Sequence, residues 1–308
     1  MSPDVRVLVT GAGGQLGGHA ARLLAERGME VYGTVRTRST ADRPAGVRWL
    51  TCDFTKGDDV RGAVADSNPS LVLHTVGLGG TSDLRALTAA NVTALAHLID
   101  ALGGAQVTKF VVIGSSAEYA PRNDREAIRE THPLGPTSAY GISKMRQFEL
   151  AHKALESGMP IVYGRPFNLI GPGVSCATAV GDITERLAQA MRKGGPQVLE
   201  VGDLDKWRDY LDVRDAAAAC VVLLERATPG VYNICSGVPV LLGEVVDKLL
   251  AQAGGAVTLS RVERGESQGY VVGDASRLRA LGWTPSYDLD TSLWDGLQYV
   301  ASRLQAAG

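Results

Sequence analysis

The chain has 308 residues, of which 45% are hydrophobic and 21% are charged, so its apolar content suffices for one large or two closely joined domains. A net charge of −2 excludes a global basic field that would hold nucleic acid or an anionic membrane. There is no run of about 18 apolar residues, no signal-peptide pattern, no CxxC pair and no metal-ligand spacing among the histidines. We therefore expect a cytoplasmic, reduced protein without a metal, and with neither nucleic acid nor membrane as a partner.

Short apolar runs alternate with segments of helical period along the first half of the chain. The runs predict strands at residues 5–10, 30–35, 47–52, 71–75, 109–114 and 160–164. The segments between them predict helices at residues 15–27, 58–66, 84–102 and 139–157. Strands rich in Val, Ile and Leu that alternate with helices favour a parallel sheet covered on both faces. Because crossovers are right-handed, we expect an α/β fold with a doubly wound, Rossmann-type sheet.

The regular alternation of strands and helices ends after Gly164, and the segment that follows is rich in proline and glycine. Further elements are expected as helices at 213–226, 241–252, 276–281 and 289–304, and as a late strand at 230–235. We interpret residues 1–165 as a Rossmann domain that elements near 209–235 complete. Residues 166–208 and 236–308 would then form a smaller C-terminal substrate-binding lobe.

The first expected strand leads into a glycine-rich turn, Gly11-Ala12-Gly13-Gly14-Gln15-Leu16-Gly17. The glycines stand between a strand and a helix, which is the context that a dinucleotide-binding turn requires. The first glycine permits the tight bend, the second lets a pyrophosphate approach the backbone, and the third lets helix and strand pack closely. Free N–H groups at the helix start then bind the phosphate. We expect the cofactor to contact Gly11, Gly14, Gln15, Leu16 and Gly17.

The residues after the second and third strands indicate which dinucleotide binds. An NAD site presents an acidic side chain after the second strand, whereas an arginine accommodates the 2′-phosphate of NADP. This chain has Arg36 there, and guanidinium groups hold phosphate by paired hydrogen bonds. We therefore expect NADP(H), with NAD(H) as the alternative. Asp53, after the third strand, would either bind the adenine amino group or cap the following turn.

A phenol and an ammonium stand four residues apart at Tyr140 and Lys144, on one face of an expected helix. A tyrosine is a poor acid–base group at neutral pH because its ordinary pKa is about 10, and a nearby lysine cation lowers that pKa. The fifth strand leads into Ser115 and Ser116, at the sheet edge where ligands bind. Either hydroxyl could donate to a substrate carbonyl while Tyr140 protonates it, although a serine pair can also cap a turn.

Residues 10–17, 115–119 and 140–144 together resemble the signature of the short-chain dehydrogenase/reductase family. Two later segments, 165–173 and 201–215, are similar to the extended branch of this family, which works on nucleotide sugars. The later segments most resemble GDP-4-keto-6-deoxymannose reductases and 4,6-dehydratases. The resemblance implies a nucleoside-diphosphate sugar as the substrate, and a homodimer built on the expected helices 84–102 and 139–157.

The resemblance also implies roles for individual residues. Ser115 takes the position of the family's catalytic serine or threonine. Ser116 is the competing candidate for that role, and if it is not catalytic we expect it to contact the substrate. Tyr140 is the acid–base tyrosine, and Lys144 also binds the nicotinamide ribose.

Three residues beyond the helix fall where this branch contacts the diphosphate of the sugar nucleotide, namely Asn168, Arg208 and Arg264. Two guanidiniums can hold a pyrophosphate that a net-negative surface would not attract. The competing interpretation of Arg208 is a salt bridge to Asp209, Asp212 or Asp215, and that of Arg264 is a solvated loop residue.

One departure from the pattern bears on the reaction. The 4,6-dehydratases have a glutamate two residues before the motif tyrosine, where this chain has Ala117. Glu118 is displaced by one residue and would face elsewhere on a strand-like backbone, which disfavours dehydration. Because 4-epimerases usually hold NAD, Arg36 favours net reduction of a 4-keto-6-deoxyhexose. The alternatives are a 4-epimerase, a dehydratase, and a cofactor-binding sensor without turnover, which typically lacks the tyrosine or lysine.

Overall fold

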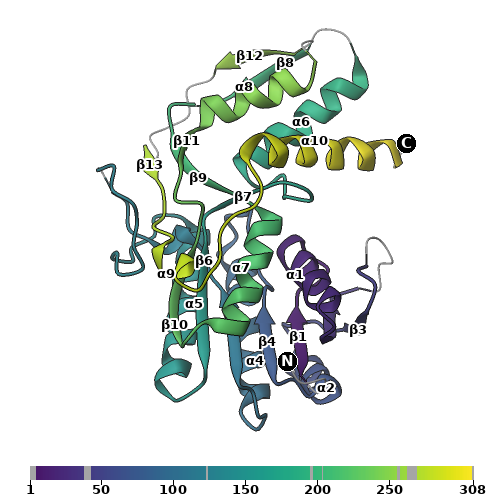
Figure 1. Cartoon of the computed structure of the whole chain (residues 1–308), viewed down its shortest axis with the longest axis vertical. Helices are drawn as coiled ribbons and strands as arrows, with labels where there is room; N and C mark the ends of the chain where they lie inside the picture. The colour runs from purple at the N-terminus through teal and green to yellow at the C-terminus, as the bar shows by residue number, and fades with distance from the viewer. Residues whose placement is uncertain are drawn as a thin grey trace.

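The computed structural model describes residues 5–37, 43–122, 124–194, 197–202, 204–254, 257–261 and 269–306. Figure 1 shows a parallel sheet flanked by helices, with the carboxyl ends of its strands pointing toward a smaller lobe. The predicted fold class, an α/β Rossmann-type sheet, is confirmed.

Seven strands, all parallel, form the main sheet in the order β10-β6-β5-β4-β1-β2-β3. Their bounds are β1 (Arg6–Thr10), β2 (Glu30–Val35), β3 (Val47–Thr51), β4 (Leu71–His74), β5 (Lys109–Ile113), β6 (Ile161–Pro166) and β10 (Gly230–Ile234). The chain runs outward from β1 to β3 and then resumes at β4 on the other side of β1. The strand order therefore reverses between β1 and β4, and at such a point ligands bind outside the carboxyl ends of the strands.

Helices cover both faces of this sheet. One layer contains α1 (Gln15–Glu26) and α7 (Val213–Arg226), and the other contains α2 (Gly57–Ser67), α4 (Ala94–Leu102) and α5 (Ala139–Glu156). Successive residues of β1 supply both layers, because Val7 and Val9 pack with the first and Leu8 with the second. This alternation explains why the central strands are apolar throughout.

The smaller lobe has a hydrophobic cluster of its own, which includes Leu187, Leu249 and Leu297. Its helices are α6 (Ala179–Lys193), α8 (Leu242–Gln252) and α10 (Leu289–Ala306), with the parallel pair β8 (Gln197–Val201) and β12 (Val257–Arg261). Between lobe and sheet lie β7 (Asn168–Ile170), β9 (Trp207–Asp212), β11 (Pro239–Leu241) and β13 (Tyr270–Val271), followed by α9 (Ser276–Arg279).

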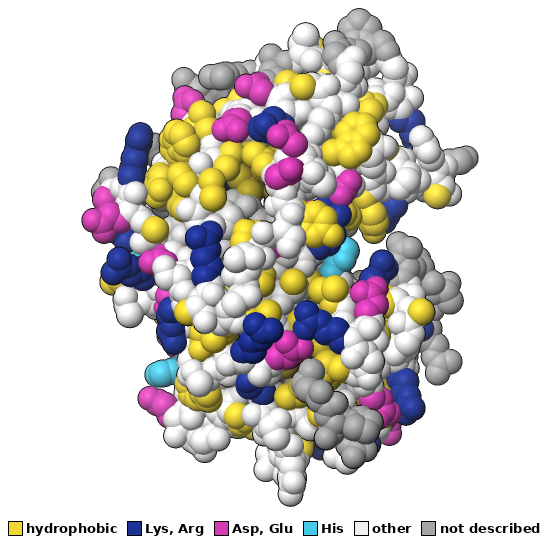
Figure 2. Space-filling view, viewed as in Figure 1, with side chains coloured by type: hydrophobic (Ala, Val, Ile, Leu, Met, Phe, Trp, Pro, Cys, Tyr) yellow, Lys and Arg dark blue, Asp and Glu magenta, His cyan; other side chains and the backbone are white. Residues whose placement is uncertain are grey.

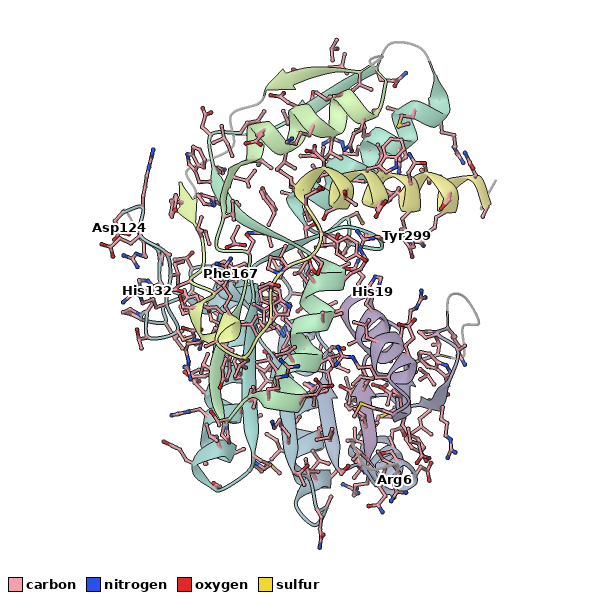
Figure 3. The ribbon with its side chains drawn as sticks, in the orientation of Figure 1. Arg6, His19, Asp124, His132, Phe167 and Tyr299 are labelled. Carbon is pink, nitrogen blue, oxygen red and sulfur yellow. The ribbon has the colours of Figure 1, made fainter. Side chains whose placement is uncertain are left out.

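The lobe and the sheet are joined at the start of α7. Arg214 donates to both carboxylate oxygens of Asp212, at 2.8 and 2.7 Å, and to Asp295 of α10 at 2.7 Å. Nearby, a methyl group at Gly173 would lie 3.6 Å from the ring of Tyr299 and 3.7 Å from Gln15. Tyr299 and His19 face each other across the notch between α10 and α1 (Figure 3), and the same notch is visible on the right of Figure 2. The carboxyl edge of the sheet is thus overhung by the lobe.

One sequence prediction needs correction, and one helix was not predicted. The expected helix 84–102 is divided into α3 (Leu84–Thr88), a π-helical turn (Ala89–Thr93) and α4. No helix was expected at α6, although its apolar residues recur at helical spacing. Within the described residues, every helix is too short or too polar to cross a membrane, and no group of three His, Cys, Asp or Glu side chains could hold a metal ion.

Candidate active site

The glycine-rich turn connects β1 to α1 as expected. Gly11 has a φ of 72°, a conformation that glycine adopts without strain. A methyl group at Gly17 would lie 2.5 Å from the carbonyl oxygen of Gly11 and 2.5 Å from Oγ1 of Thr75, so only glycine allows this approach. Gly14 is the N-cap of α1, and no side chain in the described part of the chain caps the helix there. Its first-turn N–H groups are therefore suited to an anionic ligand.

We expect Gly17→Ala to destabilise the fold by about 1–3 kcal/mol, because the added carbon meets two oxygen atoms and the turn must open. Gly62→Ala is the matched control, since a methyl group on that exposed face of α2 meets nothing within 4 Å. It should leave stability unchanged or raise it by up to about 1 kcal/mol. Urea unfolding of both variants measures the difference, and equal midpoints would contradict the role assigned to Gly17.

Arg36 and Asp53 follow β2 and β3 at the same edge of the sheet. Arg36 is exposed, directly after β2. Asp53 accepts hydrogen bonds from the backbone N–H and the hydroxyl of Thr55, at 3.0 and 2.7 Å. These bonds hold the pKa of Asp53 below its ordinary value, with a smaller contribution from the charge of Arg36. Asp53 therefore caps its turn, and an adenine contact remains a prediction.

Ser115, Tyr140 and Lys144 converge beyond the end of β5. Ser115 caps a 3₁₀ turn (Ser116–Glu118), its Oγ accepts a hydrogen bond from the N–H of Ala117 at 3.2 Å, and its side chain is close enough to Tyr140 to lower the pKa of the phenol. Lys144 lies one turn after Tyr140 on α5 and reaches back to β5, where its Nζ donates to the carbonyl of Ile113 at 3.0 Å. The sequence could not separate Ser115 from Ser116, and the contact with Tyr140 favours Ser115.

The electrostatics of this cluster differ from the sequence expectation that Lys144 lowers the pKa of Tyr140. Burial raises the pKa of Tyr140, opposed by the hydrogen bond from Ser115 and assisted by the negative charge of Glu118. Burial lowers the pKa of Lys144 to about 8, against the charge of Glu118, which raises it. The Nζ of Lys144 also donates to Oε1 of Gln147 at 2.7 Å. In this geometry Tyr140 keeps its proton at neutral pH and Lys144 is largely charged.

The segment after β4 connects the cluster to the glycine turn. Thr75 donates to the carbonyl of Thr10 at 2.7 Å, and Gly79 lies against the ring of Tyr140. Asn91 in the π-helical turn holds this segment, because it accepts from the N–H of Leu78 at 2.8 Å and donates to its carbonyl at 3.1 Å. Sequence reasoning missed Asn91, since a π-turn leaves no periodic signal; such turns often mark functional sites.

Glu118 is fully buried, so it does not open into the site. The sequence pattern predicts that Glu118 faces away from the site because its backbone would be strand-like. That reason is wrong, since residues 116–118 form a 3₁₀ turn. The carboxylate instead pairs with Arg165 of β6, with 2.7 Å between Nε and Oε2.

A cavity of about 280 Å³ opens under the lobe, lined among others by Asn168, Arg208, Lys206 and Tyr210. Two of the three expected diphosphate contacts therefore share one cavity, and Arg264 lies outside the described residues. The aspartates proposed as rivals for Arg208 are engaged elsewhere. Asp209 accepts from Ser236, Gly237 and Gly273, Asp212 pairs with Arg214, and Asp215 accepts from Ser286 and Tyr287.

A family model described as "NAD dependent epimerase/dehydratase family" matches residues 7–235, which is 229 of the 308 residues. The chain belongs to this family. The resemblance identified from the sequence is thereby confirmed.

Members of the family with different reactions are similar to this chain. It is 33% identical over 189 residues to GDP-6-deoxy-D-mannose reductase from Pseudomonas aeruginosa, covering 59% of this chain and 60% of that protein. The structure of RMD from Pseudomonas aeruginosa complexed with NADPH matches with a TM-score of 0.82 at 25% identity, covering 97% and 100% of the two chains. UDP-glucose 4-epimerase from Thermus thermophilus, complexed with NAD, matches with a TM-score of 0.83 at 26% identity, covering 96% and 99%. Family membership therefore leaves the choice between reductase and epimerase open.

Proposed function

We propose that this protein is an NADPH-dependent reductase that converts the C4 ketone of a nucleoside-diphosphate 4-keto-6-deoxyhexose to an alcohol. The observation that carries the proposal is the convergence of Ser115, Tyr140 and Lys144 at the carboxyl edge of the sheet. A phenol with a raised pKa retains its proton at neutral pH, which suits an acid in a reduction better than a base in an oxidation.

In the proposed reaction two of these side chains act on one oxygen atom. The hydroxyl of Ser115 donates a hydrogen bond to the C4 carbonyl oxygen, and Tyr140 transfers its proton to that oxygen. Lys144, one turn along α5, would bind the nicotinamide ribose, as the family resemblance implies. NADPH, when bound, supplies the hydride that reduces C4.

The residues at the sheet edge fit a dinucleotide. The Gly14 N-cap leaves the start of α1 without a side-chain acceptor in the described residues, and the contacts of Gly17 keep the turn narrow. The pyrophosphate would bind there through the N–H groups of Gln15, Leu16 and Gly17. Arg36 is exposed where an added 2′-phosphate would need a cation.

We expect Arg36→Ala to raise the KM for NADPH about 10- to 100-fold and to leave the KM for NADH unchanged, because it removes charged hydrogen bonds to the 2′-phosphate alone. Steady-state kinetics with both cofactors provides the measurement. Arg48→Ala is the control, since Arg48 is an exposed arginine that pairs with Glu30 at 2.7 Å on the outer strands. An unaltered NADPH preference in Arg36→Ala would remove the argument for NADP.

The cavity beneath the lobe supports a nucleotide sugar as the substrate. Arg208 and Lys206 contribute positive charge to its wall, and the amide of Asn168 donates to the carbonyl of Asp209 at 3.0 Å, which fixes its orientation. We infer that these groups bind the diphosphate, as the names of the similar reductases also suggest.

The alternatives make different predictions. A 4,6-dehydratase needs a free carboxyl beside Ser115, but position 117 is alanine and Glu118 is held by Arg165. A 4-epimerase would interconvert two nucleotide sugars without net consumption of NADPH. A sensor would bind the cofactor without turnover.

We also infer a homodimer from the family. Leu84 at the start of α3 is 38% exposed, in the helical region expected to form the interface. Light scattering coupled to size-exclusion chromatography measures the mass, and a monomer at micromolar concentration would contradict this inference.

The decisive test is NADPH oxidation by the purified chain with a panel of GDP- and dTDP-4-keto-6-deoxyhexoses, with the product read by NMR. We expect stoichiometric NADPH loss and a C4 alcohol with at least one substrate. Epimer exchange without NADPH loss would establish the epimerase instead.

A further inference from the structure

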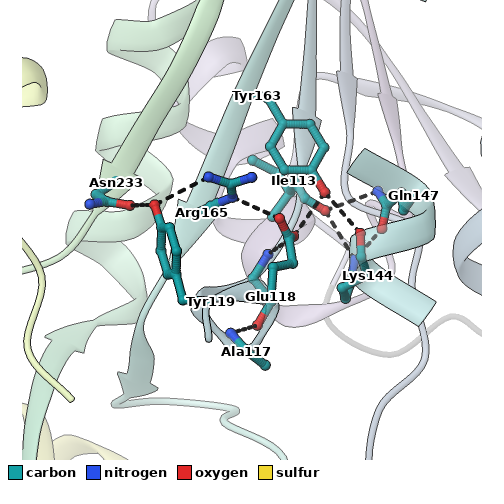
Figure 4. A network of polar contacts seen from close by, with 10 residues as sticks. Ile113, Ala117, Glu118, Tyr119, Lys144, Gln147, Tyr163, Arg165 and Asn233 are labelled. Atoms are coloured by element: carbon teal, nitrogen blue, oxygen red, sulfur yellow. Dashed lines mark hydrogen bonds and ion pairs between the residues drawn. The ribbon is translucent and has the colours of Figure 1, made fainter. Parts of the chain in front are cut away.

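A buried polar network around Glu118 adjoins Ser115 and Lys144 (Figure 4). Its centre is Glu118, whose side chain is fully buried. Oε1 accepts hydrogen bonds from the N–H of Ser115 at 2.8 Å and from the hydroxyl of Tyr163 at 2.9 Å. Oε2 accepts from Nε of Arg165 at 2.7 Å. The start of the 3₁₀ turn and strand β6 therefore meet at one carboxylate.

The position of this carboxylate is strongly determined. A methyl group at Gly114 would overlap Oε1 of Glu118 and the ring of Tyr163, so this position, directly after β5, must be glycine. Arg165 is 1% exposed and lies between the rings of Phe148 and Tyr119, at 4.4 and 4.8 Å from their centroids. Neither Glu118 nor Arg165 can move without disturbing packed aromatic side chains.

The network has a second connection through Tyr119. Its hydroxyl accepts from Nη1 of Arg165 at 3.2 Å and donates to Oδ1 of Asn233 at 2.7 Å. Asn233 belongs to β10, the edge strand beside β6. Hydrogen bonds therefore connect the 3₁₀ turn that begins at Ser115 to both β6 and β10.

We propose that Glu118 is a positioning residue, whose carboxylate fixes the backbone at Ser115 so that the serine hydroxyl faces Tyr140, and which places a buried negative charge behind Tyr140 and Lys144. This inference rests on the proposed function, in which Tyr140 is the acid. It assigns a task to a residue that the family's motif residues do not include.

The charged and titratable groups around Tyr140 and Lys144 come from four elements. They are Glu118 of the 3₁₀ turn, Tyr163 and Arg165 of β6, His74 of β4, and the two side chains themselves on α5. Burial lowers the pKa of His74 to about 3, so it is neutral at working pH. Glu118 raises the pKa of both Tyr140 and Lys144. Removing its charge must therefore lower both pKa values.

Two substitutions separate position from charge. Glu118→Gln keeps an oxygen that can accept from the N–H of Ser115 but removes the charge. Because the pKa values of Tyr140 and Lys144 then fall, we expect the decline of kcat at alkaline pH to begin at a lower pH. At low pH, kcat should be largely retained. Glu118→Ala removes the acceptor as well, and kcat falls by up to about 100-fold at every pH, with KM for substrate and cofactor little changed. Tyr163→Phe, which keeps the ring and loses one donor, should fold readily and reduce kcat by a few-fold.

A readout that does not depend on turnover makes the test independent of the proposed function. Phenolate absorbance of each variant is titrated against the same variant carrying Tyr140→Phe, and the difference reports Tyr140. We expect a lower midpoint in Glu118→Gln than in the parent chain. Asp215→Asn is the matched control, because Asp215 is also a buried carboxylate, accepts from Ser286 and Tyr287, and is not among the charges that act on Tyr140.

The outcomes are distinguishable. If no ketosugar is reduced but the midpoint shifts, the proposed function fails and the electrostatic role of Glu118 holds. If Glu118→Gln and Tyr163→Phe retain the parent kcat profile and the parent midpoint, the positioning role is overturned. A shift of the same size in Asp215→Asn would overturn it too, since a general loss of stability would then explain the effect.

Discussion

Tyr140→Phe is expected to reduce kcat by about 100- to 10,000-fold, which is the contribution of a positioned general acid. The ring packs against Gly79, and phenylalanine preserves this contact while removing only the hydroxyl that meets Ser115. The Kd for NADPH should stay within about twofold, because the glycine turn and Arg36 are untouched.

Stopped-flow reduction of the ketosugar and fluorescence titration of NADPH provide the two measurements. Tyr32→Phe is the control, since the Tyr32 hydroxyl donates to Glu30 at 3.0 Å on β2, away from the sheet edge. A Tyr140→Phe variant with parental kcat would show that another group supplies the proton.

Arg165→Met is expected to destabilise the protein by about 3–5 kcal/mol at neutral pH, because it leaves the carboxylate of Glu118 buried without its cation. Burial already raises the pKa of Glu118, and the charge of Arg165 opposes that rise. Without Arg165 the folded state binds a proton at Glu118 more tightly than the unfolded state does. Stability lost at neutral pH should therefore return as the pH falls toward the ordinary pKa of a glutamate, about 4.3.

Urea unfolding at a series of pH values measures this dependence. Combining Arg165→Met with Glu118→Leu removes both charges, and we expect it to recover most of the loss at neutral pH. If the free energy of unfolding depended on pH in the same way for Arg165→Met and the parent chain, the ion pair would not contribute to stability and the prediction would be wrong.

The main sheet could be predicted from the sequence because its central strands are apolar on both faces and therefore stand out as continuous runs, with the outer strands following in the same alternation with helices. The predicted 30–35 and 47–52 correspond to β2 (Glu30–Val35) and β3 (Val47–Thr51), and the predicted 213–226 to α7 (Val213–Arg226). The lobe was harder. The short strands that join it to the sheet, β7, β9, β11 and β13, have two to six residues and are defined by pairing with distant segments, which a local pattern does not reveal.

The site was predictable where chemistry depends on adjacent residues and not where it depends on the fold. The glycine turn, Ser115, Tyr140 and Lys144 are short motifs with fixed spacing. Glu118 stood beside them in sequence, but its partner Arg165 is 47 residues later, so their ion pair is visible only in three dimensions. The same holds for Asn91, which meets Leu78 and Ser143 only because a π-turn directs it inward.

The late return of β10 to the sheet has a consequence for synthesis of the protein. β10 pairs with β6, and α7 packs on α1, yet both elements leave the ribosome after β7, α6, β8 and β9 of the intervening chain. The apolar surface of α1 lacks its cover until α7 emerges, and β6 presents an unpaired edge until β10 emerges. The nascent chain must therefore hold an unfinished sheet through roughly 70 residues of translation, and a ribosome stalled within that interval would leave the free edge of β6 open to association with other chains.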